Sequence, residues 1–290
     1  MELVGMAIAL IVVGLFVGVC SGLLGIGGGT LIVPILRMDF GLSAYSATAT
    51  SLFTIVFTSL SGAGTHLRNR TCIPKLGVVL GVGGAITSAL GVALANVSPE
   101  WAVMVVAALI IAYSAYNMLN KALKLPKTEK EGASKPQSAP AAPDAPAAQP
   151  APAAEAIPAP EDFSVTKKVL VVGFCIGLIA GLASGYVGVG GGFIMVPLMT
   201  TWLSVPMKKA SGTSLIAIII LAIPGVIEHI VLGNVDYLAG VLIVAGSIPS
   251  AVLGAKLIKK VPERSLRFLF AAFLGVAAVA LVLNEAGILG

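Results

Sequence analysis

The stretch SGLLGIGGG at residues 21–29 returns as SGYVGVGGG at residues 184–192, so a serine-led, glycine-rich sequence occurs twice in one chain. Each copy lies within an apolar run and is followed by a proline, Pro34 or Pro197. Consecutive glycines break a helix, because each loses more conformational freedom on folding than any other residue. Both stretches therefore predict a helix that is interrupted inside an apolar segment.

The match between the two stretches continues along the chain at one constant offset of 163 residues. A single match is expected by chance in an apolar background, but a series of matches in one register predicts a duplication. The other matched positions are Thr50-Ser51-Leu52 with Thr213-Ser214-Leu215, Gly62 with Gly225, Gly77 with Gly240, Gly91 with Gly254, Pro99-Glu100 with Pro262-Glu263, and the only two histidines, His66 with His229.

The composition places most of the chain in a lipid bilayer. Of the 290 residues, 57% are hydrophobic and only 11% are charged, and the mean hydropathy is +1.01. Apolar runs of about 20 residues, the length that a membrane-crossing helix needs, recur on both sides of the middle of the chain. The runs are continuous and not alternating, which is typical of helices and not of barrel strands. We predict an all-α polytopic protein of the plasma membrane of a bacterium or archaeon, with about eight to ten membrane segments.

Between the matched halves the sequence changes character. Residues 125–163 are rich in Ala, Pro, Gln and Glu, a composition typical of a flexible, partly polyproline linker. The predicted organisation is a first transmembrane repeat at residues 1–124, a disordered linker at 125–163 and a second transmembrane repeat at 164–290.

The distribution of Lys and Arg predicts opposite orientations for the two repeats. Basic residues in short loops favour the cytoplasm. In the first repeat they lie at residues 68–75, whereas the equivalent loop of the second repeat holds Asp236. The basic loops of the second repeat are at 208–209 and 256–264 instead. Corresponding loops are therefore expected on opposite sides of the membrane, with four to five membrane segments in each repeat and the linker in the cytoplasm.

The glycine breaks are the first candidates for a substrate site. Bare amides at the start of a half-helix attract anions, because the N–H groups are unpaired and the helix dipole is positive there. Inverted repeats commonly bring two such breaks together near the membrane midplane. A role in close helix packing is the alternative. The candidate residues are Gly27, Gly28, Gly29, Gly190, Gly191 and Gly192.

The matched hydroxyl and imidazole side chains are further candidates. Ser and Thr side chains donate hydrogen bonds to oxyanions, although in membrane helices they often bond to a backbone carbonyl instead. Histidine titrates near neutral pH, so the matched pair His66 and His229 are candidates for gating or proton coupling, with a structural role at the membrane interface as the alternative. The hydroxyl candidates are Thr50, Ser51, Thr213 and Ser214.

Two copies of Gly-x-Gly-Gly-Gly-x-x-x-x-Pro, at 25–34 and 188–197, are each followed by Ala-x-x-Thr-Ser-Leu, at 47–52 and 210–215. In these motifs the sequence resembles the TauE/SafE family of sulfite exporters. The resemblance covers both halves but not the linker. It implies transport of sulfite, a sulfonate or another sulfur-containing or organic anion across the plasma membrane.

The apolar runs themselves favour an anion over a cation. Cation-coupled transporters usually carry Asp or Glu within their spans, whereas Glu228 is the sole candidate here. An inside-negative potential drives an anion outward by about 2.3 kcal/mol per charge at 100 mV. We therefore predict an exporter of a small anion, with sulfite or a related organosulfur anion as the leading candidate, working by alternating access at the interface of the two repeats. We expect lipid and a small anion as its partners, and no enzymatic activity, cofactor, metal or nucleic acid; the sequence leaves homo-oligomer formation open.

Two other classes of function stay open at this point. A membrane thiol-disulfide electron carrier would use Cys20 and Cys175, but these cysteines are not matched in the duplication, because Cys20 falls on Ala183 and Cys175 on Val12. A scaffold that transports nothing would recruit a partner through the linker.

Overall fold

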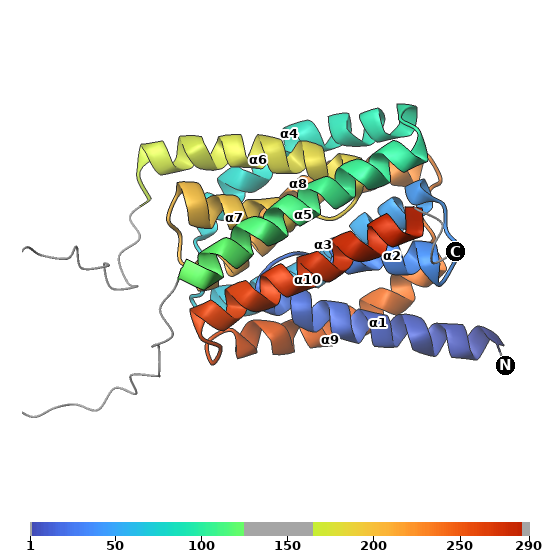
Figure 1. Cartoon of the computed structure of the whole chain (residues 1–290), viewed down its shortest axis with the longest axis horizontal. Helices are drawn as coiled ribbons and strands as arrows, with labels where there is room; N and C mark the ends of the chain where they lie inside the picture. The colour runs from blue at the N-terminus through green and yellow to red at the C-terminus, as the bar shows by residue number, and fades with distance from the viewer. Residues whose placement is uncertain (1, 125–164, 286–290) are drawn as a thin grey trace, which may run out of the picture.

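The computed structural model describes residues 2–124 and 165–285, and within these ranges every regular element is a helix (Figure 1). The predicted linker at 125–163 lies outside the described residues. The helices are α1 (Glu2–Leu24), α2 (Gly29–Met38), α3 (Ala44–Arg68), α4 (Pro74–Val97), α5 (Glu100–Lys124), α6 (Lys167–Val187), α7 (Gly192–Trp202), α8 (Met207–Val231), α9 (Tyr237–Leu257) and α10 (Glu263–Glu285).

The helices fall into two length classes. Among the described residues, seven helices, α1, α4, α5, α6, α8, α9 and α10, are long and apolar enough to cross a membrane. Helix α3 has 25 residues, as α8 does, but is richer in Ser and Thr. With 10 and 11 residues, α2 and α7 rise only about 15 Å, half of the hydrocarbon thickness. The prediction of an all-α membrane protein with broken helices is confirmed.

The long helices pair between the two halves of the chain. Helix α1 lies along α9, and α4 lies along α6. A Cβ at Gly14 would collide with the carbonyl oxygen of Ile243, and a Cβ at Gly177 would collide with that of Leu80. The absence of a side chain allows both backbones to approach this closely. The two contacts are equivalent in the duplication, because Gly177 corresponds to Gly14 and Ile243 corresponds to Leu80 at the offset of 163 residues.

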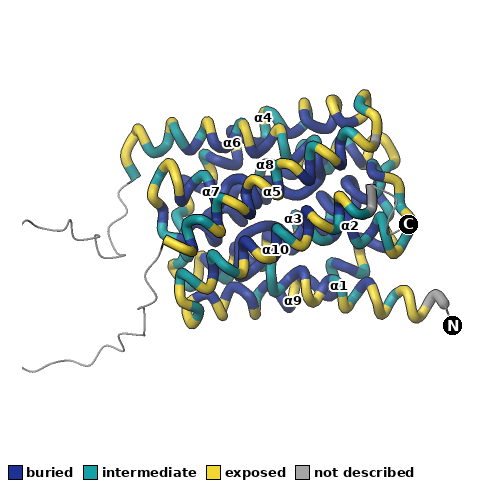
Figure 2. Tube along the Cα trace, viewed as in Figure 1, coloured by how far each residue is buried: buried dark blue, intermediate teal, exposed yellow. Residues whose placement is uncertain are grey.

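Helices α3 and α8 form the centre of the bundle and run in opposite directions. Gly62 of α3 lies against Leu215 near the start of α8, and Gly225 near the end of α8 lies against Leu52. Helices α5 and α10 pack on each other across one face (Figure 1). Figure 2 shows buried residues concentrated along the central helices and exposed residues on the outward faces.

The two ends of the bundle differ in charge. We call the end where α5 stops and α6 starts the basic end (Figure 1). At the other end, where α1 starts and α10 stops, lie Asp39, Asp236 and the single basic residue Arg37 among those described. The described basic residues at the basic end are Arg68, Arg70, Lys75, Lys121, Lys124, Lys167, Lys168, Lys208, Lys209, Lys256, Lys259, Lys260, Arg264 and Arg267.

Candidate functional site

The two glycine breaks lie against each other inside the bundle. A Cβ at Gly29 would lie 2.8 Å from the backbone of Val189, and a Cβ at Gly192 would collide with the carbonyl oxygen of Gly25. Each break is therefore in backbone contact with the other. The residues of both breaks are buried, so the structure brings the six glycine candidates into one place.

Both breaks have the same backbone conformation, which explains their sequence. Each holds three glycines at positive φ, a region that side chains disfavour. The first of the three ends the preceding helix: Gly25 N–H donates to Ser21 O at 2.8 Å, and Gly188 N–H donates to Ser184 O at 2.7 Å. The φ values are 72°, 84° and 90° at Gly25, Gly27 and Gly28, and 74°, 86° and 66° at Gly188, Gly190 and Gly191.

The amide groups of the breaks are mostly unpaired. Among the described residues, no hydrogen-bond acceptor serves the N–H groups of Gly27, Gly28 or Gly29 in the first break, or of Gly190 and Gly191 in the second. Gly192 N–H donates back to Gly190 O at 2.8 Å. Buried backbone N–H groups in proteins are nearly always paired. Here they lie at the positive ends of α2 and α7, which makes the place suited to an anion.

Two isoleucines cover the breaks. A Cβ at Gly27 would lie 3.1 Å from Ile55 Cγ2 and 3.2 Å from Ile218 Cδ1, and a Cβ at Gly190 would lie 3.0 Å from Ile55 Cδ1. Both isoleucine side chains are fully buried. They come from α3 and α8 and are equivalent in the duplication, so each central helix contributes one apolar side chain against the site.

The serines of the Thr-Ser-Leu triplets bond to the breaks themselves. Ser51 Oγ donates to Gly188 O at 2.9 Å, and Ser214 Oγ donates to Gly25 O at 2.7 Å. Each central helix thus supports the break of the opposite half, at the glycine where the long helix ends. These two hydroxyls are therefore beside the predicted site, with their protons donated to the protein backbone.

The threonines of the triplets cap loops of the opposite half. Thr50 Oγ1 accepts a hydrogen bond from Asp236 N–H, and Thr213 Oγ1 accepts one from Ile73 N–H, both at 2.9 Å. Asp236 and Ile73 are the N-cap residues of α9 and α4. The structure thus places these two hydroxyls at helix starts and not at the glycine breaks.

The two histidines lie in the last turns of α3 and α8, and both side chains are buried within the protein. Nδ1 of His66 lies 2.7 Å from Thr71 Oγ1, and its Nε2 lies 2.8 Å from Gly22 O. Nδ1 of His229 lies 3.4 Å from Asn234 Nδ2, while its Nε2 has no partner among the described residues. One histidine therefore holds the end of α1 at the basic end, and its equivalent at the opposite end holds no helix.

The cysteines give no support to paired redox chemistry. Cys20, Cys72 and Cys175 are all free. Burial raises the pKa of the Cys72 thiol, in the loop after α3, to about 11. This thiol is therefore protonated, and a poor nucleophile, at neutral pH.

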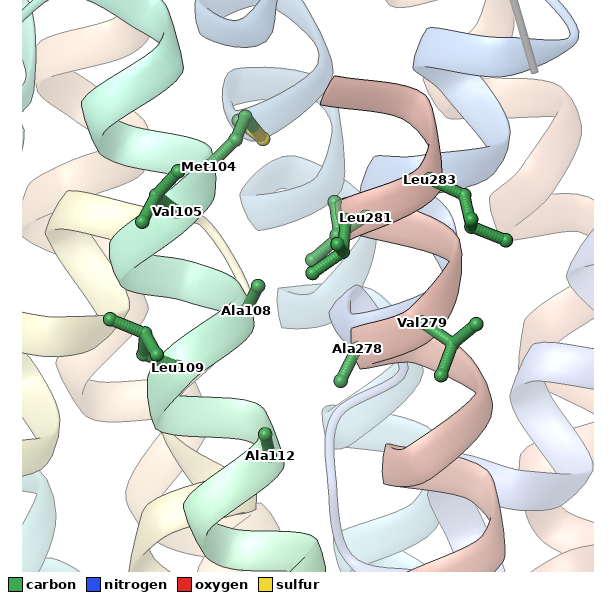
Figure 3. Close-up of a pocket in the computed structure, with 10 residues that line it drawn as sticks. Met104, Val105, Ala108, Leu109, Ala112, Ala278, Val279, Leu281 and Leu283 are labelled. Atoms are coloured by element: carbon green, nitrogen blue, oxygen red, sulfur yellow. The ribbon is translucent and has the colours of Figure 1, made fainter. Parts of the chain in front are cut away.

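Surface grooves of the bundle are less suited to an anion than the breaks. The groove in Figure 3 lies between α5 and α10, has a volume of about 570 Å³, and is lined by ten apolar residues, among them Met104, Leu109 and Val279. A second groove of about 710 Å³ lies between α5, α6 and α7 and is also lined mainly by apolar side chains. Neither groove is lined by a break glycine.

A model of the family described as sulfite exporter TauE/SafE matches residues 10–281. The chain belongs to the TauE/SafE family. The "Probable membrane transporter protein YdhB" of Bacillus subtilis is 30% identical over 271 residues, which cover 92% of this chain and 98% of that protein. The "Probable membrane transporter protein YunE" of the same organism is 25% identical over 266 residues, or 89% of this chain and 91% of the relative.

A plant relative matches a shorter part of the chain. The "Sulfite exporter TauE/SafE family protein 3" of Arabidopsis thaliana is 32% identical over 126 residues, 41% of this chain and 26% of the plant protein. No solved structure matches the chain. Together with the seven apolar helices, the family makes the protein a multi-pass transporter of the plasma membrane.

Proposed function

We propose that this TauE/SafE transporter exports a small anion, with sulfite or a related organosulfur anion as the leading candidate. The observation that carries the proposal is the meeting of two half-helix starts, α2 and α7, whose buried glycine amides are unpaired (residues 27–29 and 190–191). An anion between them would receive N–H donors from both halves and would lie at the positive ends of two helix dipoles. The backbone amides of the breaks would bind the anion without a cofactor.

The surroundings of the breaks support an anion and not a cation. The side chains nearest to the break glycines include Val17, Ile55, Ile218 and Leu221, and none of the nearest side chains is acidic. Glu228 is on α8, only three residues before its end. A cation between the breaks would therefore meet positive dipole ends and no carboxylate. The membrane potential would drive a monovalent anion outward without a coupling ion.

The packing suggests which bodies move during alternating access. Glycine contacts join α1 to α9 and α4 to α6 backbone to backbone, which favours each pair moving as one body. Contacts between α3 and α8 are made through side chains such as Leu215 and Ile218. We propose that α1, α3 and α9 move as one body against α4, α6 and α8, about the contact between α3 and α8. We also propose that residues 1–124 and 164–290 are inverted repeats.

The charge difference between the ends sets the proposed orientation. Lys and Arg gather at the basic end, and short basic loops favour the cytoplasm. We propose that the basic end is cytoplasmic, which places the linker inside the cell and the start of α1 outside. A cysteine substituted for Asn234, in the loop before α9, would then react with a membrane-impermeant maleimide added to intact cells, whereas one substituted for Lys259 would not.

The test of function is flux into proteoliposomes that contain the purified protein. Sulfite, sulfate, acetate and a potassium control are compared with and without an imposed potential. The proposal expects sulfite flux that follows the potential and no potassium flux. Absence of flux for every anion, from protein that melts cooperatively, would contradict it.

A further inference from the structure

Three buried hydroxyl groups at the breaks have no hydrogen-bond partner among the described residues: Ser21 Oγ, Thr30 Oγ1 and Ser184 Oγ. Their residues are at most 1% exposed. Ser21 and Ser184 are equivalent in the duplication and begin the two glycine-rich stretches. Their place at the start of both glycine-rich stretches is the sequence signal for these two serines, which were not among the predicted site residues.

The two serines lie beside the glycines that cap the half-helices. A Cβ at Gly28, the N-cap of α2, would lie 3.8 Å from Ser21 Cβ. A Cβ at Gly191, the N-cap of α7, would lie 3.5 Å from Ser184 Cβ. Thr30 is the second residue of α2. The side chains of Ser21 and Ser184 are therefore close to the cap glycines of α2 and α7, and Thr30 lies two residues after Gly28.

Free hydroxyls are unusual in a helix, where Ser and Thr commonly donate to a carbonyl one turn earlier. Other hydroxyls of this protein do so: Thr54 donates to Thr50 O at 2.8 Å, and Ser250 donates to Gly246 O at 2.9 Å. Ser21 and Ser184 make no such bond. A buried hydroxyl without a partner is costly. Ser59 and Ser88 are also unpaired, so what distinguishes Ser21, Thr30 and Ser184 is their place beside the unpaired break amides, where one hydrogen-bond acceptor would serve both kinds of donor.

The donors at the breaks are all neutral. The side chains nearest to the break glycines include no Lys, Arg or His. The cost of transferring an ion out of water rises with the square of its charge. Dipoles and hydroxyls alone therefore suit a singly charged anion far better than a dianion.

We propose that Ser21, Thr30 and Ser184 bind the transported substrate together with the break amides, and that the site selects a singly charged oxyanion such as a sulfonate or hydrogen sulfite. This inference rests on the proposed function. The site is also asymmetric, because Phe193 stands where the first half has Thr30 and is fully buried. More hydroxyl donors thus surround the first break, so the oxyanion group lies nearer to α2.

The test compares methanesulfonate, a monoanion, with sulfate, a dianion of similar shape, in proteoliposomes. The variants are Ser21→Ala, Thr30→Val and Ser184→Ala. The control is Ser88→Ala, which also removes a buried hydroxyl without a partner, beside Gly225 of α8; its equivalent in the second half is already Ala251. We expect wild-type flux of methanesulfonate and not of sulfate. We also expect at least a tenfold higher KM for Ser21→Ala, a smaller rise for Ser184→Ala, and an unchanged KM for Ser88→Ala.

Thermal melting separates binding from folding. Removing an unpaired hydroxyl breaks no hydrogen bond, so Ser21→Ala should melt at or above the wild-type temperature while its KM rises. An unchanged KM in both Ser21→Ala and Ser184→Ala, or sulfate flux equal to that of methanesulfonate, would overturn the inference and leave anion transport standing. Absence of flux for methanesulfonate, sulfite and acetate alike would instead overturn the proposed function beneath it.

Discussion

The first and second glycine breaks have the same backbone conformation but differ in the polar side chains around them. Both have three glycines at positive φ, and both are supported by a serine from the opposite central helix, Ser214 or Ser51. Yet the first has Thr30 where the second has Phe193. The histidine of the first half contacts the end of α1, and that of the second has a free Nε2. The shared part sets the geometry of the breaks, and the differences make the surroundings of the two breaks chemically unequal.

The largest effect is expected from a side chain at the cap glycines. In Gly28→Ala the new methyl would collide with Val17 Cγ1 at a φ of 90°, whereas in Gly191→Ala its nearest neighbour, Ala180 O, is 3.2 Å away. We expect Gly28→Ala to lower the free energy of unfolding by roughly 2–4 kcal/mol and Gly191→Ala by about 1–2 kcal/mol. Thermal melting in detergent measures both. Equal losses of stability would contradict the structure, in which a side chain has less space at Gly28 than at Gly191.

The supporting serines test what the breaks share. Ser51→Ala and Ser214→Ala each leave a buried glycine carbonyl without its hydroxyl donor, at Gly188 and Gly25. Each variant should lose about 1–2 kcal/mol of stability, and the two losses should be similar. Chemical denaturation of the two proteins side by side measures this. A loss in one variant alone would mean that only one break depends on the opposite central helix.

The histidines test how the halves differ. His66→Ala removes two hydrogen bonds, to Thr71 and Gly22, and His229→Ala removes the weaker contact with Asn234. Both leave a similar cavity, so the difference in stability should be about 1 kcal/mol, with His66→Ala the less stable. Melting temperatures measured at one pH provide the comparison. The reverse order would contradict the assignment of His66 as the histidine that holds α1.

The smallest effect is expected at the cysteines. Replacing Cys20, Cys72 and Cys175 by alanine should leave anion flux unchanged, because the three thiols are free and none belongs to the breaks. Burial keeps the Cys72 thiol protonated at neutral pH, with a pKa of about 11, so its alkylation should be slow until the pH approaches that value. Loss of activity in the triple variant would return attention to a thiol-disulfide carrier.

The breaks could be predicted from the sequence because glycine in an apolar run has a local physical meaning. The starts of α2 and α7, at Gly29 and Gly192, follow from the same signal. The partners of the Thr-Ser pairs could not be predicted, because register identifies equivalent residues and not contacting ones. Thr50 caps the start of α9, 186 residues away, and nothing local to Thr50 specifies that.

The pairing of the long helices between the two halves could not be predicted from the sequence either. The glycine at position 14 is an ordinary small residue in a sequence, and only the fold shows that it faces Ile243. The contacts of the two histidines could not be predicted for a related reason: the sequence places both near helix ends but does not show which loop residues fold against them. Thr71 and Asn234, in those loops, are the residues they contact.

The pairing of α1 with α9 also has a consequence for biogenesis. Helix α1 is synthesised long before α9, so its glycine face stays without this partner until residues 237–257 have been made. Such distant contacts delay assembly and prolong the exposure of unfinished surfaces. A chain that ended after α5 would lack the partners of both α1 and α4. Neither of these helix pairs can form before the second half of the chain has been inserted.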